Sequence, residues 1–427
     1  MMNMKKSIVA ALLFVELGVW GLKLGQGQAQ GAVPSGGLSR ISIASLGAVG
    51  DGATLNTMAI QNAIDQCAKD GGGTVVVPVG RFVSGAIFLK PGVDFELQTG
   101  AVLCASTDIK DFPTQQHVRF EGHFSDHASS LLNVEHCDGF KLAGKGELDG
   151  NGAAYWKSSA PGGRPRLCEI CDSQNVVVSG VRFYNSPSWN LHFYNCRQCV
   201  VEKCRFEIAP HAKGPSTDGT DIDSSQGFLV THCFYSVNDD CICLKGNRYD
   251  GLNQMPPSPP VEAIHIKDCI FARGQGALSL GTEATIIRNV EFENSVVQGK
   301  MPMLCIKFRP DTAGQHYSNI HVQGIRLDGT GKIVSLEPTH GTKVPVSKVP
   351  ISDASDIVVE DVSGHFGSFG SIAGGSSVAV SDVLIQNIQV KVLGGALLET
   401  NGATHVRFKH VMVGVFPLDR SNSHEGG

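Results

Sequence analysis

Four aspartates in two short motifs are the residues of this chain best suited to chemistry. Asp218 and Asp221 lie in a segment rich in Ser and Thr, and the pair Asp239-Asp240 follows roughly 20 residues later, about one coil of a repetitive β structure. Residues one coil apart can become neighbours, so the spacing favours one cluster of carboxylates. A protonated carboxyl beside an ionised one can cleave a glycosidic bond, because the first protonates the leaving oxygen and the second activates water. Taken alone, each motif is typical of a turn.

The composition is that of a globular protein with a large core. The chain has 427 residues, of which 42% are hydrophobic and 18% charged. The formal net charge is -5, and no basic segment points to a nucleic-acid partner. A polyanionic substrate would therefore need local cations to bind. The 51 glycines and the aromatic content of 7% favour short strands joined by many turns.

The N-terminus is predicted to be a secretory signal peptide spanning residues 1–29. Lys5 and Lys6 precede the apolar run from Ile8 to Val15, which is the order of such signals. Residues 30–427 are then expected to form one domain, secreted to the extracellular space or the periplasm. No later apolar run is long enough to span a membrane, and we expect a soluble monomer.

A short apolar pattern recurs along the chain and predicts its fold. In each copy an apolar residue is followed three positions later by an apolar or small one, and then two positions later by another apolar one. The first positions of the copies are Val178, Val201, Val230, Ile266, Phe292, Val322, Ile385 and Phe408, and Val359-x2-Val362 is a partial copy. Alternating apolar residues indicate strands, and a repeat of this length predicts an all-β, single-stranded right-handed parallel β-helix of about ten coils. An antiparallel sandwich fits less well, because few hairpin-turn sequences separate the copies.

One helix is expected before the strands, from Thr57 to Ala68. Asn56 can cap its N-terminus, and apolar residues recur at helical spacing. The shared face comprises Ile60, Ala63, Ile64 and Cys67. An amphipathic helix at this place would cover the first, open coil of the solenoid.

The 13 cysteines all follow the predicted signal. Their odd number leaves at least one thiol outside any intramolecular disulfide. The spacings Cys168-x2-Cys171 and Cys196-x2-Cys199 are those of zinc ligands, but both fall in segments that resemble strands of successive coils. We therefore expect no metal and no cofactor. The repeated Cys204, Cys233 and Cys269 should stack as small core residues.

Insertions between the strands could form the walls of a substrate groove. They are the segments Gln115 to His127, Trp156 to Arg166 and Asn247 to Pro260. The first holds three histidines whose spacing matches no metal motif, so we expect them at the surface or in contact with substrate.

The chain resembles glycoside hydrolase family 28, the polygalacturonases and related pectinases, over roughly Ile41 to Val413. The segments that carry the resemblance are Leu46 to Gly52, Gly144 to Gly152, Asn185 to Trp189, Ser216 to Asp221, where Ser216 replaces the family's Asn, and Asp239 to Cys241. The resemblance implies a right-handed parallel β-helix and inversion of the anomeric centre. It also implies that Asp239 is the general acid, and that Asp218 and Asp240 hold and activate the water.

Two positions on the leaving-group side depart from the family pattern. Gln275 stands where the family has a histidine, and Cys305 stands where it has an arginine. Glutamine cannot titrate, although it can still form hydrogen bonds, and a thiol cannot bind a carboxylate through two parallel N–H groups as arginine does. By the resemblance Lys307 keeps one of the two family cations, and Arg309 is a candidate to replace part of the missing arginine. We expect Gln275, Lys307, Arg309 and Asp221 to bind substrate.

The sequence thus predicts a secreted glycosidase that hydrolyses pectin-type, galacturonate-containing polysaccharide by an inverting acid/base mechanism. Two alternatives stay open. One is a β-helix that binds polysaccharide without cleaving it, which the lost histidine and arginine favour. The other is a polysaccharide lyase on a similar fold, which would need calcium and a basic proton abstractor. Cleavage within the polymer and cleavage at its end are both compatible with these residues.

Overall fold

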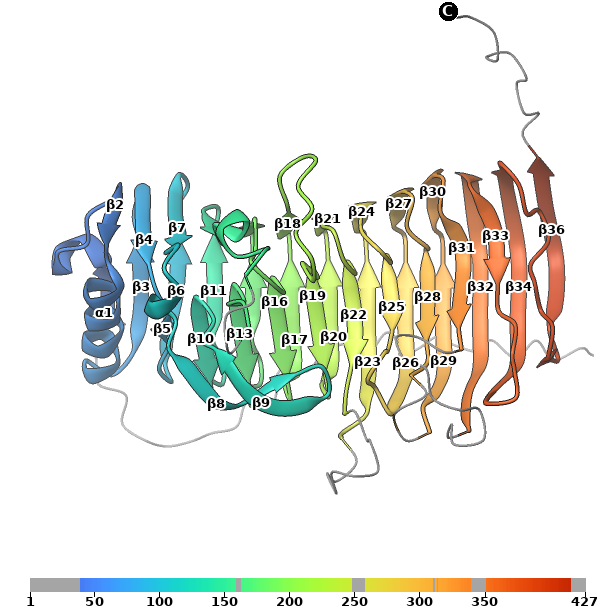
Figure 1. Ribbon diagram of the computed structural model, residues 1–427, viewed down its shortest axis with the longest axis horizontal. Coiled ribbons are helices and arrows are strands. Elements are labelled where there is room, and N and C mark those ends of the chain that lie inside the picture. The colour runs from blue at the N-terminus through green and yellow to red at the C-terminus, as the bar shows by residue number, and fades with distance from the viewer. Residues whose placement is uncertain are drawn as a thin grey trace, which may run out of the picture. The chain divides into compact units, whose positions relative to one another are not determined.

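The computed structural model describes residues 39–158, 163–247, 258–309, 312, 314–338 and 351–415. The predicted signal peptide, 1–29, lies outside these residues, as does most of the insertion 247–260. Within the described residues, strands of successive coils pair in parallel along the stack (Figure 1). Parallel crossovers are right-handed with few exceptions, and the fold is the right-handed parallel β-helix that the repeat predicts.

Each coil contributes strands to three parallel ladders. The first comprises β1 (Ser39–Ser42), β3 (Gly73–Val77), β6 (Val93–Leu97), β11 (Lys141–Gly144), β14 (Val177–Ser179), β17 (Arg197–Glu202), β20 (Gln226–Thr231), β23 (Val261–Lys267), β26 (Ile286–Glu293), β29 (His316–Gln323), β32 (Ser352–Phe366), β34 (Val378–Val392), β35 (Ala403–Thr404) and β36 (Arg407–Val415). The second comprises β2 (Asp51–Leu55), β4 (Gly80–Ser84), β7 (Ala101–Ala105), β12 (Glu147–Asp149), β15 (Arg182–Tyr184), β18 (Arg205–Glu207), β21 (Phe234–Ser236), β24 (Ile270–Arg273), β27 (Val296–Gly299) and β30 (Arg326–Gly329), and joins the first at β32.

The third ladder is a separate ten-stranded sheet, which agrees with the expected ten coils. It comprises β5 (Ile87–Phe88), β10 (Leu132–Glu135), β13 (Cys168–Cys171), β16 (Leu191–Tyr194), β19 (Thr220–Asp223), β22 (Ile242–Lys245), β25 (Leu278–Leu280), β28 (Leu304–Lys307), β31 (Lys332–Glu337) and β33 (Ser368–Ser371). Short 3-10 helices are η1 (Ile43–Leu46), η2 (Ile109–Asp111) and η3 (Gly152–Ala154).

The apolar repeat forms the core in the predicted register. Val178, Val201 and Val230 lie opposite one another in successive coils and are fully buried. On the neighbouring ladder, aromatic rings stack in the same way, with ring centroids 4.8 Å apart for Phe183 and Phe206 and 4.8 Å apart for Phe206 and Tyr235. Such pairs add about 0.5–1.5 kcal/mol each beyond the area they bury.

The small middle position of the repeat lies in a sharp turn between the first and second ladders. The residue before it adopts a left-handed backbone, as at Lys203 (φ 55°) and His232 (φ 55°). Cys204 and Cys233 follow these residues and point inward, where their thiols donate to the carbonyl oxygens of Val178 and Val201 one coil back, at 3.6 Å in both cases. A small, weakly polar side chain fits there because it fills the corner and bonds the preceding coil.

The helix α1 spans Thr57–Lys69 and buries the predicted face. It packs against β1, β3 and β5 at the N-terminal end of the stack (Figure 1). Asn56 is its N-cap residue, but the side chain of Asn56 bonds Val49, Thr54 and Val83 instead of the first turn. That α1 protects the open coil stays a prediction.

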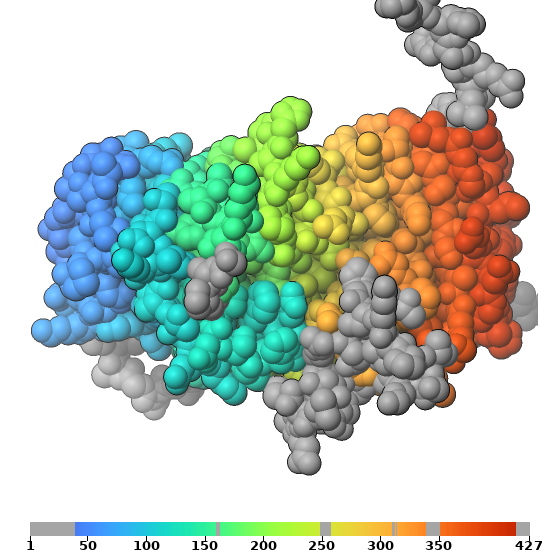
Figure 2. Space-filling view, viewed as in Figure 1, coloured from blue at the N-terminus to red at the C-terminus, as the bar shows by residue number. Residues whose placement is uncertain are grey.

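The insertion at 115–127 is an antiparallel hairpin, made of β8 (Thr114–Phe120) and β9 (His123–Ala128). It extends across the coils that carry β13 and β16 (Figures 1 and 2). No helix in the described part of the chain is long and apolar enough to cross a membrane.

Candidate active site

The site is built on the ten-stranded sheet and on the loops that lead into its strands. In-register pairing places Tyr194, Asp223 and Lys245 in one line across β16, β19 and β22. Asp218 comes from the loop before β19, and Asp239-Asp240 from the loop before β22. The backbone N–H of Gly219 donates to the carbonyl oxygen of Asp240 at 2.9 Å, which holds these loops side by side as the coil spacing predicts.

A cleft of about 220 Å³ opens over these strands. Its described lining is Glu121, Trp189, Ser216, Asp218, Asp239, Asp240, Lys245, Gln275, Gly281, Thr282, Glu283, Lys307 and Arg309. Six of the seven site residues expected from the sequence therefore share one cleft. The seventh, Asp221, is fully buried and pairs with Lys245 at 3.5 Å, so it can influence a substrate only through that lysine.

Asp240 is the carboxylate most firmly held ionised. The Lys307 ammonium donates to Oδ2 of Asp240 at 2.7 Å. Burial alone would raise the pKa of Asp240, but the lysine charge more than offsets it and the pKa is lowered. Oδ1 of Asp240 is buried and has no hydrogen-bond partner among the described residues.

The pKa of Asp239 is shifted in the opposite direction. Its side chain is only partly buried and lines the cleft. Burial and the adjacent charge of Asp240 raise the pKa of Asp239. A proton on Asp239 beside an ionised Asp240 is the division of roles that acid/base hydrolysis requires.

Asp218 lies against both of these residues. One carboxylate oxygen of Asp218, one of Asp240 and the thiol sulfur of Cys243 all lie within 4.8 Å of one another. Burial and the charges of Asp221 and Asp239 raise the pKa of Asp218 well above its usual range, although Lys245 lies 3.5 Å away. These pKa shifts favour a proton on Asp218 and ionisation of Asp240.

Several functional candidates were missed by sequence reasoning. Lys245 forms ion pairs with both Asp218 and Asp221, and Glu283 pairs with Arg309 at 3.0 Å. Register counting could have found Lys245, because it lies directly opposite Asp223 in the next coil. Glu283 lies beyond the end of β25 and outside the apolar repeat, so no local signal marks it.

Gln275 and Cys305, the two residues that differ from the family pattern on the leaving-group side, lie in different environments. Gln275 is exposed in the cleft, where its amide donates to the carbonyl oxygen of Asn238 at 3.3 Å. Cys305 is buried on β28 and does not line the cleft. Lys307 and Arg309 are the cations on this side, and both are paired with protein carboxylates.

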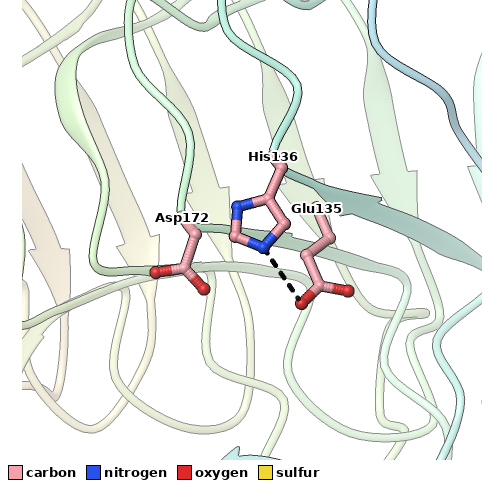
Figure 3. A group of neighbouring side chains, drawn as sticks. All are labelled: Glu135, His136 and Asp172. Carbon is pink, nitrogen blue, oxygen red and sulfur yellow. Dashed lines mark ion pairs between the residues drawn. The ribbon is translucent and has the colours of Figure 1, made fainter.

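Two groups in the described residues have the atoms to hold a metal ion. One is Asp218, Asp240 and Cys243 in the cleft. The other is Glu135, His136 and Asp172 at the surface, where the imidazole lies 3.8 Å from Glu135 (Figure 3). The second group is largely exposed, and no further feature there points to an ion. Cys168, Cys171, Cys196 and Cys199 form no such group.

The cleft is closed on one side by the hairpin β8–β9. Arg119 on β8 donates two hydrogen bonds to the buried carboxylate of Asp223, at 2.8 and 3.2 Å. Phe120 stacks on Trp189 with ring centroids 5.0 Å apart. Beneath them, Arg166 pairs with Glu169 and also donates to the carbonyl oxygen of Arg119 at 2.6 Å.

Comparison with known proteins agrees with this geometry. The family model Glycosyl hydrolases family 28 matches residues 88–410. A probable polygalacturonase of Vitis vinifera is 29% identical over 301 residues, covering 67% of this chain and 60% of that protein. An exopolygalacturonase of Zea mays is 24% identical over 386 residues, covering 87% of this chain and 85% of its own.

Solved structures share the fold. An exopolygalacturonase from Thermotoga maritima superposes with a TM-score of 0.72 at 21% identity, over 90% of this chain and 93% of that one. The polygalacturonase from Erwinia carotovora gives a TM-score of 0.67 at 21% identity, over 91% of this chain and 100% of its own.

Proposed function

Because the chain belongs to glycosyl hydrolases family 28, we propose that it hydrolyses galacturonate-containing, pectin-type polysaccharide with inversion at the anomeric carbon. The observation that carries the proposal is the pair Asp239-Asp240 in one cleft, with the pKa of Asp239 raised and that of Asp240 lowered. Neighbouring carboxyls whose pKa values are driven apart divide into an acid and a base.

In the proposed reaction, Asp239 donates its proton to the glycosidic oxygen as the bond to the anomeric carbon breaks. A water molecule attacks that carbon from the opposite face. Asp240 accepts the proton of this water, and Asp218 positions the same water because its carboxyl lies beside Asp240. The reaction returns Asp239 ionised and Asp240 protonated, and solvent restores the starting state.

Lys307, Arg309 and Gln275 are proposed to contact the sugar on the leaving-group side. Lys307 already forms an ion pair with Asp240, and the buried Cys305 cannot reach a sugar carboxylate. We therefore propose that this side accepts a less acidic residue than galacturonate, as in rhamnogalacturonan.

The experiment that tests this function is product analysis on rhamnogalacturonan and polygalacturonan. Hydrolysis yields new reducing ends whose first-formed anomer is inverted, which proton NMR detects. A lyase would instead yield an unsaturated product that absorbs in the ultraviolet, and a binding protein would yield no product at all. Either result would refute the proposal.

The proposal includes export and a monomeric state. The export part rests on the charge and apolar pattern of the N-terminal residues. Fractionating cells that express the full chain, followed by sedimentation analysis of the mature protein, tests both parts.

A further inference from the structure

We propose that the hairpin β8–β9 makes this protein exo-acting: it cleaves at the end of a polysaccharide chain and releases the non-reducing terminal sugar. This inference rests on the proposed function and adds its mode of attack. The hairpin divides what would otherwise be a continuous groove along the ten-stranded sheet, so that a polysaccharide can extend from the catalytic carboxylates in one direction only.

The floor on both sides of the hairpin is a single line of in-register residues. Glu135, Cys171, Tyr194, Asp223 and Lys245 follow one another from β10 to β22. The first three line a cavity of about 490 Å³ on the far side of the hairpin. Lys245 lines the catalytic cleft of about 220 Å³ on the near side. Asp223 lies between the two, at the point where the hairpin meets the floor.

At this point there is no room for a sugar. The side chains of Arg119 and Asp223 are each 1% exposed and are joined by two hydrogen bonds. The parallel contact of Phe120 with Trp189 fills the neighbouring space, and the Arg166 guanidinium lies 4.7 Å from the Trp189 ring centre. A hairpin held only at its ends could move aside, but this one is bonded to the floor through a buried ion pair.

The barrier stands next to the reacting groups. The ammonium of Lys245, which pairs with Asp218, lies 4.8 Å from the centre of the Trp189 ring. Glu121, in the turn of the hairpin, itself lines the catalytic cleft.

The position of the proposed acid sets the direction. Asp239 lies one coil farther from the hairpin than Asp218, and the backbone N–H of Gln275, in the next coil, donates to the carbonyl oxygen of Asp239 at 2.9 Å. The departing oxygen goes to the acid, so the leaving group extends away from the hairpin toward Gln275 and Lys307. The leaving group carries the reducing end, and the enclosed sugar is therefore the non-reducing terminus.

The first test follows products formed by the wild-type protein. Octamers prepared from rhamnogalacturonan and from polygalacturonan carry a fluorescent label at the reducing end. We expect labelled fragments that shorten stepwise from the unlabelled end, with the largest fragments appearing first. Early labelled fragments of middle length would overturn the inference while leaving hydrolysis itself intact.

The second test does not depend on turnover. Binding of the same octamers to Asp239→Asn is measured with a bulky cap at either the non-reducing or the reducing end. We expect the cap at the non-reducing end to weaken binding at least tenfold and the other cap to have little effect. Equal affinities for the two capped octamers would overturn the inference even if no activity were found.

A variant tests the hairpin directly. Arg119→Met removes the ion pair that joins the hairpin to the floor, and Arg40→Met, at an exposed ion pair far from the cleft, is the matched control. We expect fragments of middle length to appear with Arg119→Met alone. Purely terminal cleavage by a folded Arg119→Met protein would show that the hairpin is not the barrier.

Discussion

Two clusters of buried charge lie side by side on the same sheet, and they are neutralised differently. Under the hairpin, Arg119 and Arg166 face Asp223 and Glu169. Burial opposes ionisation there, yet Arg166 and His192 hold the pKa of Glu169 at about 2. At the cleft, Asp218, Asp239, Asp240 and the buried Asp221 lie near two lysines, Lys245 and Lys307. The pKa values of Asp218, Asp221 and Asp239 are all raised.

The difference separates a structural cluster from a reactive one. Where each carboxylate has its own guanidinium, all charges are fixed and no proton is available for transfer. Where carboxylates outnumber cations, like charges force some of them to keep protons. Proton transfer can occur only in the second arrangement. Three substitutions and one comparison of substrates test this division.

The largest effect is expected from Asp239→Asn. It removes the proposed proton donor, and general acid catalysis contributes about 10²- to 10⁴-fold. We expect kcat to fall by that factor with an unchanged circular dichroism spectrum, and Asp218→Asn and Asp240→Asn to be nearly as severe. Asp94→Asn is the control, because Asp94 also has a raised pKa but lies on β6, away from the cleft. A folded Asp239→Asn protein that keeps more than about a tenth of the rate would exclude Asp239 as the acid.

Arg119→Met should affect stability instead. Removing one partner of a buried ion pair costs about 3–5 kcal/mol, whereas the exposed pair lost in Arg40→Met is worth about 0–1 kcal/mol. Urea unfolding followed by circular dichroism measures both. Equal losses for the two variants would show that the pair beneath the hairpin is not structural.

Polygalacturonan should be a poorer substrate than rhamnogalacturonan. Gln275 and Cys305 remove two charged groups from the leaving-group side, and a lost charged hydrogen bond costs about 1.5–3 kcal/mol, or about tenfold or more in rate for each group. Initial rates of reducing-end release on the two polymers decide the matter. Equal or faster cleavage of polygalacturonan would contradict the expectation.

The smallest change is a shift of the pH profile in Lys307→Gln. Lys307 lowers the pKa of both Asp240 and Asp239. Without it, the base ionises only at higher pH and the acid keeps its proton to higher pH, so both limbs of the kcat/KM profile move upward. Arg288→Gln, at a surface pair with Glu262, should leave the profile in place. A profile of Lys307→Gln that moves to lower pH would show that this lysine does not control the pair.

The features that could be predicted correctly from the sequence are those determined by short, local sequence patterns. The apolar repeat predicted the register of Val178, Val201 and Val230 because each coil repeats the same short pattern. The meeting of Asp218 with Asp240 followed from the same coil length. The helix α1 was predicted to within one residue of its end.

What sequence reasoning missed arises between distant segments. Arg119 and Asp223 are 104 residues apart, and the sequence around neither residue indicates that they pair. Asp221 was grouped with the substrate contacts because it shares a motif with Asp218, yet its side chain is buried against Lys245. Asn56 was correctly predicted as the residue before α1, but its side-chain amide donates to the carbonyl oxygen of Thr54 in the preceding turn and does not cap the helix.

The corner cysteines affect how long the protein survives. None of the 13 cysteines, all of which the structure describes, is in a disulfide, and all except Cys171 are buried. While the protein is folded, burial raises the pKa of the Cys204 thiol and keeps it unreactive. In an unfolded chain under oxidising conditions, these thiols can join in non-native pairs that cannot return to their corners. Under such conditions, the working lifetime of the enzyme is set by how slowly its coils open, and not by an equilibrium between folded and unfolded chains.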